Sequence, residues 1–183
     1  MLHVVAKGTL LRSGHRGARN ATVDRSMNHG KASGSKGPHA AAASRLLIDN
    51  EAEIRGLVAR YEALVARYQT DPGPVVVTHG EIHPGNVMAT PEGWVFVDWD
   101  TVLLAPPERD LWRLVQGDRS MLRAYADATG SPPNEWLVDL YGIRWDLAEI
   151  ASFAAEFRRP HEDNDNSRKA LEILRSVVGR LRA

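Results

Sequence analysis

The nine residues THGEIHPGN at 78–86 set two histidines, a glutamate and an asparagine between apolar segments. A run of three valines precedes them at 75–77, and the apolar segments 87–89 and 94–97 follow. Polar groups enclosed by strands must find partners or they destabilise the fold. A polar cluster this dense is therefore typical of a loop reserved for chemistry. Two more acids, Asp98 and Asp100, stand where the last apolar segment ends.

The apolar pattern around this cluster predicts a mostly helical α+β fold. Residues 75–77 predict a buried strand, and the segments on either side of Thr-Pro-Glu-Gly at 90–93 predict one small β-hairpin. Elsewhere apolar residues recur every three or four positions. They predict a long amphipathic helix that follows Ala40 and ends at the DPGP sequence 71–74, and further helices over 109–116, 120–129, 134–157 and 167–181.

Composition predicts one folded domain behind an irregular segment. The chain has 183 residues, of which 43% are hydrophobic, enough for one ordinary core. Residues 1–45 hold eight bases and one acid. The Gly, Ser and Asn content of the first part indicates an irregular basic segment over 1–39, followed by a folded domain over 40–183. An arm that binds an acidic partner stays open as an alternative, but the segment has no aromatic residue for base stacking, so nucleic acid is not an expected partner.

Two further features concern the location of the protein. The chain has no cysteine, which excludes disulfides and thiolate metal sites. No apolar run is long enough to cross a bilayer, and the N-terminal sequence lacks the apolar core of a secretion signal. We therefore expect no membrane partner and a cytoplasmic location.

The order of polar residues in the cluster indicates phosphoryl transfer. Glu81 and Asn86 lie five positions apart in the order H-x-E-x-x-x-x-N, and Asp98 ends the second hairpin strand. Kinases use such residues as a carboxylate that receives the proton of the attacking hydroxyl and as two oxygen ligands of Mg²⁺. Solvated carboxylates are the simpler interpretation of Asp98 and Asp100. Their association with Glu81 and Asn86 favours metal binding.

The sequences HGEIHPGNV and GWVFVDWDTVLLAPPERDLW resemble the aminoglycoside phosphotransferase family, small-molecule kinases with a protein-kinase-like fold. APPERDL is similar to the spectinomycin phosphotransferase-like members. The resemblance implies the C-terminal lobe of that fold, with Glu81 at the catalytic-base position. It implies Asn86 and Asp98 as ligands of Mg²⁺ and ATP, or of another nucleoside triphosphate. His79 and Asp110 would then brace the loop.

Other residues are assigned less closely by the same resemblance. His83 and Asp100 match the motif without a definite role, and Asp110 also suits the acidic first turn of a helix. Six aromatic residues recur at helical spacing and predict mostly core positions, with a cleft role left open for one or two of them such as Trp145: Trp112, Trp136, Tyr141, Trp145, Phe153 and Phe157. Trp145 and Glu149, together with Asp100, are candidates for a substrate cleft, where acidic side chains would suit a cationic amino sugar.

Two departures from the family pattern stand out. The base position is typically Asp, and the extra methylene of Glu81 moves the carboxylate by roughly 1 Å, a misplacement that can cost about a hundredfold in rate. Retuning and inactivation both stay open. The sequence before Glu51 also shows no glycine-rich hairpin, and its lysines lie in no strand-like run. We therefore expect the N-terminal nucleotide lobe to be missing, and a separately encoded lobe is a candidate partner.

Three functions compete on these observations. The first is an ATP-dependent phosphotransferase, truncated and weak or inactive alone, that acts on a hydroxyl of a small molecule such as an aminoglycoside or aminocyclitol antibiotic and so gives antibiotic resistance. The alternative is a non-catalytic C-lobe remnant that acts as a binding module. A metal-dependent hydrolase is less favoured. A zinc site on His79 and His83 is disfavoured because Gly80, Pro84 and Gly85 prevent a helix. The polar run 161–166 lacks the glycine and glutamate of a calcium loop and predicts a capped inter-helix loop.

Overall fold

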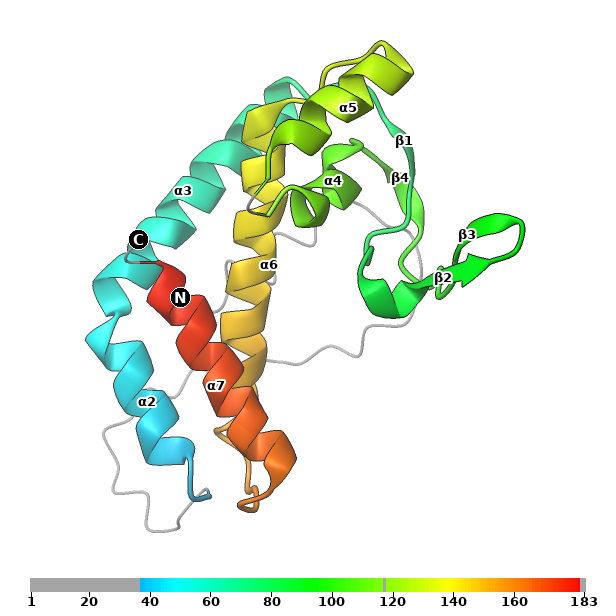
Figure 1. Cartoon of the computed structure of the whole chain (residues 1–183). Helices are drawn as coiled ribbons and strands as arrows, with labels where there is room; N and C mark the ends of the chain where they lie inside the picture. Colours follow the sequence, from blue (N-terminus) through cyan, green and yellow to red (C-terminus); the bar gives the residue numbers. More distant parts are fainter. Residues whose placement is uncertain (1–36, 117, 182–183) are drawn as a thin grey trace. The chain divides into compact units, whose positions relative to one another are not determined.

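The protein is described by a computed structural model that covers residues 37–116 and 118–181 (Figure 1). Along the chain the elements are α2 (Ala40–Asp49), α3 (Glu51–Thr70), β1 (Val76–Thr78), the 3-10 turn η2 (Pro84–Asn86), β2 (Val87–Thr90), β3 (Gly93–Phe96), β4 (Leu103–Ala105), α4 (Glu108–Leu114), α5 (Ser120–Thr129), α6 (Glu135–Glu156) and α7 (Asp165–Arg180). This part of the chain is mostly helical, as predicted. The predicted irregular segment 1–39 lies outside the described residues except for its last three.

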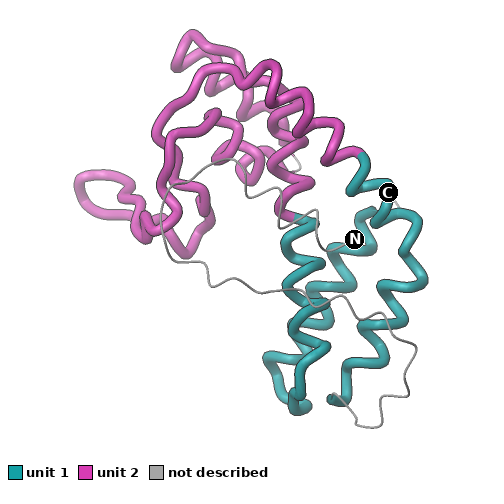
Figure 2. The backbone as a smooth tube through the Cα atoms, turned by 180° about the vertical axis from the view of Figure 1, so that it is seen from behind, with its two compact units in different colours: residues 1–59, 146–183 teal, residues 60–145 magenta. Residues whose placement is uncertain are grey.

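The described residues form two compact units (Figure 2). One takes its described residues from 37–59 and 146–181, and the other is residues 60–145. Helices α3 and α6 contribute one end to each unit. We call these the helical unit and the loop unit, because the second contains all the strands and the polar sequence 78–86. None of the helices described is both long and apolar enough to cross a bilayer.

The core of the helical unit is apolar and closely packed. Side chains from α2, α3, α6 and α7 meet there, and Leu174 and Val178 of α7 are completely buried. Helix α7 presents these residues on one face because its apolar positions recur at helical spacing. Asn164 and Ser167 form a capping box at its first turn, which confirms the prediction of a capped loop before this helix.

The predicted long helix after Ala40 is broken once. Helices α2 and α3 are separated at Asn50, whose side-chain amide donates to the carbonyl of Leu46 at 2.7 Å. Asn competes with the backbone for hydrogen bonds in this way and disfavours an uninterrupted helix. The later helices agree with the predicted ranges to within two residues at each end. Gly130 ends α5 in the left-handed conformation with φ of 71°.

The strands form two separate antiparallel pairs. The predicted hairpin is confirmed as β2 and β3, with Val87 opposite Phe96 and Thr90 opposite Gly93. A second pair joins β1 to β4, with Thr78 opposite Leu103. The sequence analysis predicted one hairpin only and missed β4, because a strand of three residues is too short to show an alternating pattern.

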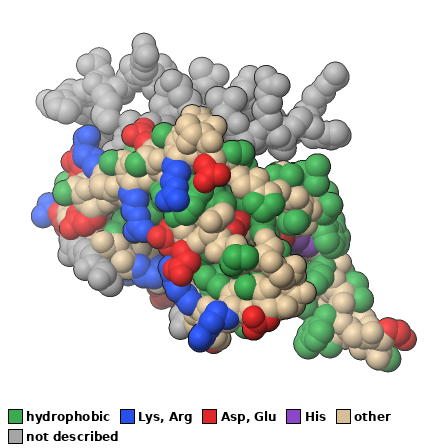
Figure 3. Space-filling model, turned by 90° about the horizontal axis from the view of Figure 1, so that it is seen from above, with side chains coloured by type: hydrophobic (Ala, Val, Ile, Leu, Met, Phe, Trp, Pro, Cys, Tyr) green, Lys and Arg blue, Asp and Glu red, His purple; other side chains and the backbone are tan. Residues whose placement is uncertain are grey.

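A strand forms close to the predicted residues 75–77, but the prediction that these residues are buried is wrong. Val77 is 65% exposed and Leu104, on the paired strand, is 68% exposed. Figure 1 shows the strands on the right, and on that side of the space-filling view hydrophobic side chains are exposed (Figure 3). Branched side chains favour extended backbone whether or not they are buried, and among the described residues each sheet has only two strands.

Candidate active site

The loop that follows β1 is fixed first by Asp110 on α4. The two carboxylate oxygens of Asp110 accept the backbone N–H groups of His79 at 2.8 Å and of Gly80 at 2.6 Å. Buried backbone donors need such partners, and here a single side chain supplies both. The start of α4 therefore determines where the loop leaves the strand.

The His79 side chain connects this loop to the end of β3. The ring is buried, and its Nε2 lies 2.8 Å from the carbonyl of Val97 while its Nδ1 accepts the N–H of Glu81 at 3.3 Å. A nitrogen that faces a carbonyl must carry the proton, so this geometry assigns the neutral Nε2–H tautomer. The ring also packs against Trp99 with 4.7 Å between centroids. Both nitrogens are occupied, which leaves none for a zinc ion.

Asn86 joins the loop to the hairpin. Its buried side-chain amide donates to the carbonyl of Glu81 at 3.0 Å, so the amide oxygen Oδ1 faces away from that carbonyl. Its backbone carbonyl accepts the N–H of Val97 at 3.0 Å and extends the β2–β3 ladder by one pair. Asp98 is the residue after Val97. The ladder therefore brings Asn86 and Asp98 to the same end of the hairpin.

Asp98 has a strained backbone. Its φ is 63°, a value uncommon for a residue other than glycine, although Asp tolerates it better than most. Strain of this kind costs about 1–3 kcal/mol and is found mainly at functional sites. The turn that it makes is closed by Trp99, whose indole donates to the carbonyl of Phe96 at 2.9 Å. Asp98 itself is exposed, and no other described residue donates a hydrogen bond to its carboxylate.

Glu81 is held through its backbone and leaves its side chain without a partner. Its N–H and its carbonyl are bonded to His79 and Asn86, while its carboxylate takes no hydrogen bond from any residue that the structure describes. His83 accepts the N–H of Gly85 on Nδ1 at 3.1 Å and so caps the 3-10 turn. Asp100 is exposed, and its side chain makes no hydrogen bond or ion pair with any described residue.

Sequence reasoning missed Thr78, Thr101 and Arg109. The Thr101 hydroxyl donates to the carbonyl of His79 at 2.6 Å. One Arg109 nitrogen, Nη1, donates to the hydroxyl of Thr78 at 2.7 Å, and the other, Nη2, donates to the carbonyl of Thr101 at 2.8 Å. The signal available in the sequence was the arginine that directly precedes Asp110.

The Arg109 guanidinium stays charged in this position although burial opposes it. Burial lowers its pKa, and the neighbouring carboxylates of Asp110 and, more weakly, Glu81 oppose that effect. An arginine starts from so high a pKa that it stays protonated under all ordinary conditions. The loop is therefore built around a permanent positive charge.

Two of the three candidates for a substrate cleft, Trp145 and Glu149, lie on α6, and the third, Asp100, follows β3, so the cleft stays a prediction. Trp145 is half-buried and packs against Trp112, with 5.5 Å between the two ring centroids. The Arg113 guanidinium lies 5.1 Å from the ring centroid of Trp145. Those contacts suit a core role. Glu149 belongs to the helical unit, whereas Asp100 belongs to the loop unit. All six aromatic residues predicted as core are buried or half-buried.

The donor atoms at the end of the hairpin suit one class of metal. Asn86 offers an amide oxygen and Asp98 a carboxylate, which are the hard ligands that Mg²⁺ takes from proteins while it keeps several waters. No group of three or more His, Asp or Glu side chains within residues 37–116 and 118–181 is placed to hold a metal. A closed site made by these protein side chains alone, as for structural zinc, is not formed there.

Comparison with known proteins was made on the sequence and on the fold. A model of the phosphotransferase enzyme family matches residues 8–153. Protein StrN of Streptomyces griseus is 39% identical over 85 residues, which are 46% of this chain and 24% of StrN. Spectinomycin phosphotransferase APH(9)-Ia matches in two crystal structures, one with ADP and spectinomycin and one with AMP, each at a TM-score of 0.65 and 20% identity.

These matches cover different shares of this chain and of the proteins that it resembles. The whole of this chain aligns with the two crystal structures, but it covers only 54% and 55% of their chains. The chain thus spans about half the length of the phosphotransferase that it resembles, and their common feature is the kinase-like fold. The family match covers most of the chain. The protein belongs to the phosphotransferase enzyme family.

Proposed function

We propose that this chain provides the catalytic loop of a kinase that transfers the γ-phosphoryl group of ATP, or of another nucleoside triphosphate, to a hydroxyl of a small molecule. The acceptor class that we propose is an aminoglycoside or aminocyclitol antibiotic. The family match supports the transfer, and the similarity to a phosphotransferase solved with ADP and spectinomycin supports the choice of acceptor.

The observation that carries this proposal is the position of Asn86. Its side chain bonds the carbonyl of Glu81, and its backbone bonds Val97, the neighbour of Asp98. One residue thus links the backbone of Glu81, the proposed base, to the chain beside Asp98, the proposed metal ligand. Phosphoryl transfer depends on positioning and charge neutralisation, so a rigid link of this kind is what the chemistry requires.

Each residue has a proposed role that follows from its contacts. The carboxylate of Glu81, which no described residue hydrogen-bonds, accepts the proton of the attacking hydroxyl as that oxygen bonds to the γ-phosphorus and the bond from this phosphorus to the β-phosphate oxygen breaks, releasing the nucleoside diphosphate. The oxygens of Asn86 and Asp98 would hold Mg²⁺, which would neutralise charge on the phosphates. His79 and Asp110 keep the loop backbone in place through the bonds described above. His83 shapes the turn between Glu81 and Asn86.

None of the described strands carries a lysine that could hold the phosphates. The only lysine among residues 37–116 and 118–181 is Lys169, which lies on α7 of the helical unit. Kinases of this fold hold the phosphates with a strand lysine and a glycine-rich hairpin. We therefore expect the 183-residue chain alone to show little or no turnover.

The test uses the chain alone and the chain joined to the nucleotide lobe of a spectinomycin phosphotransferase placed before Ala40. A coupled assay with ATP, Mg²⁺ and spectinomycin or aminoglycosides should show turnover only for the fusion. Asp98→Ala should abolish it, whereas Glu92→Ala, a matched acid at the exposed tip of the same hairpin, should not. A fusion that binds ATP and stays inert, both with Glu81 and with Glu81→Asp, would contradict the proposed function and favour a binding module.

A further inference from the structure

Arg109 connects two segments that the proposed chemistry needs in a fixed relation. Its Nη1 bonds the hydroxyl of Thr78 and lies 3.4 Å from the carbonyl of the same residue, just before the loop that carries Glu81. Its Nη2 bonds the carbonyl of Thr101, three residues after Asp98. One planar, charged group therefore joins the chain on the Glu81 side to the chain on the Asp98 side.

The surroundings of Arg109 show that the protein is built to accommodate this bridge. Gly80 lies directly against the guanidinium, with φ of 92°, and a Cβ at that position would collide with the Arg109 side chain. Thr78 is completely buried, and its hydroxyl passes the interaction on by donating to the carbonyl of Leu103 at 2.8 Å. The bridge thus reaches β1, the loop and β4.

We propose that Arg109 is a positioning residue that holds the Glu81 loop and the Asp98 segment in one register. This inference rests on the proposed function for its catalytic meaning. The adjacent Asp110 holds only the loop, through His79 and Gly80. Arg109 is the side chain on α4 that bonds both segments. Lysine carries the same charge but has one nitrogen, so it can serve one end of the bridge and not both in the same geometry.

The test compares Arg109→Lys with Arg113→Lys in the full 183-residue chain. Arg113 is the matched control because it lies on the same short helix and packs over the rings of Trp112 and Trp145, with no hydrogen bond to either segment. Amide hydrogen exchange is measured for residues 79–81 and 98–102. Arg109→Lys should accelerate exchange in both segments, and Arg113→Lys in neither. Acceleration in the loop alone, or in neither segment, would overturn the proposal.

A second readout concerns the metal ligands. Mn²⁺, a paramagnetic substitute for Mg²⁺, should broaden the resonances of Asn86 and Asp98. Arg109→Lys should weaken the binding of Mn²⁺ by about tenfold, which is the lower end of the usual effect when a residue that supports a metal ligand is changed. If Mn²⁺ leaves these resonances unchanged in the wild type, the proposed metal site fails. The exchange comparison then decides the role of Arg109 by itself.

The wild type supplies a measurement that needs no variant. In rising urea below the unfolding transition, the amides of Gly80 and Val102 should exchange with one common opening free energy, because the bridge makes the two segments open together. The hairpin tip around Glu92 should open more easily. Separate opening free energies for Gly80 and Val102 would overturn the proposal even if Arg109→Lys did not fold.

Discussion

The core of the helical unit and the surroundings of the loop 78–86 bury different kinds of groups. The core of the helical unit is apolar, and Leu174 and Val178 have no exposed surface. Around the loop the buried residues include Thr78, His79 and Asn86, which are polar and bonded. Apolar burial stabilises a fold without fixing directions, whereas hydrogen bonds fix distances and angles. The apolar core therefore supplies stability, and the polar bonds around the loop supply geometry.

The strands beside the loop sharpen this difference. Their valines, leucines and tryptophan are largely exposed, so little of their stability comes from burial. The backbone ladders and the side-chain bonds of Thr78, Arg109 and Asp110 hold them instead. Truncation of an apolar side chain should therefore matter greatly in the buried core of the helical unit and little on these exposed strands.

The largest effect is expected from Leu174→Ala. The side chain is fully buried between helices, and its removal leaves a cavity that should lower the free energy of unfolding by about 2–5 kcal/mol. Val77→Ala, at a side chain that is 65% exposed, should change it by less than about 0.5 kcal/mol. Urea unfolding followed by circular dichroism measures both. Equal effects would contradict the contrast between the buried core and the exposed strands.

The same division explains what the sequence predicted. Helices α4 to α7 and the hairpin β2–β3 were predicted because the apolar spacing of each element is local. Glu81, Asn86 and Asp98 were also visible as candidates, because they lie close together in the sequence, just before and just after one hairpin. The role of each in catalysis stays a prediction.

The remaining features depend on contacts between segments distant in the sequence. Thr78 and Arg109 are 31 residues apart, and nothing in either neighbourhood predicts their bond. The strand β4 forms because β1 pairs with it, and the exposure of Val77 follows from how few strands are present to cover it. Helix α2 ends where Asn50 bonds the preceding turn, and an isolated Asn in a helical pattern does not predict which partner it takes.

A smaller effect, confined to the loop unit, is expected from Gly80→Ala. Both its left-handed φ and the collision with the Arg109 guanidinium oppose a side chain there, so stability should fall by about 1–3 kcal/mol. The amide signals of His79 and Thr101 should shift together as Arg109 is displaced. Thermal unfolding and amide spectra measure the two effects.

The matched control is Gly130→Ala. Gly130 has φ of 71° but no heavy atom within 4 Å of an added Cβ, so only the backbone term of about 1 kcal/mol applies. Its substitution should leave the loop signals unchanged. If Gly80→Ala costs no more than Gly130→Ala, the contact with Arg109 does not constrain the loop.

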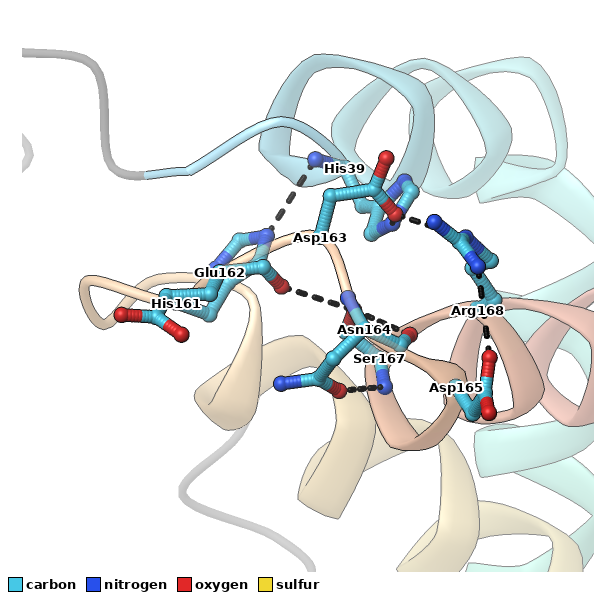
Figure 4. A network of polar contacts seen from close by, with 8 residues as sticks. All are labelled: His39, His161, Glu162, Asp163, Asn164, Asp165, Ser167 and Arg168. Carbon is cyan, nitrogen blue, oxygen red and sulfur yellow. Dashed lines mark hydrogen bonds and ion pairs between the residues drawn. The ribbon is translucent and has the colours of Figure 1, made fainter.

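The smallest effect is expected in the helical unit, where one polar network lies at the start of α7 (Figure 4). Asp163 accepts from Arg168 at 2.8 Å and lies 3.2 Å from the ring of His39, which precedes α2. The hydrogen bond from Arg168, and then the nearby His39, lower the pKa of Asp163 below its ordinary value of 3.8. An exposed ion pair contributes little to the free energy of unfolding, and salt weakens the interaction further.

The lowered pKa of Asp163 determines how its contribution to stability changes with pH. An acid with a lowered pKa in the folded state stabilises the fold above its ordinary pKa, and this contribution is lost as the pH falls through the lowered value. The urea midpoint of the wild type should therefore exceed that of Asp163→Asn slightly at pH 6, and the two should converge near pH 2. Glu162→Gln, in the same loop, is the control, because no described residue bonds its carboxylate. A difference between wild type and Asp163→Asn that persists unchanged at pH 2 would show that the substitution acts through the shape of the loop and not through the charge of Asp163.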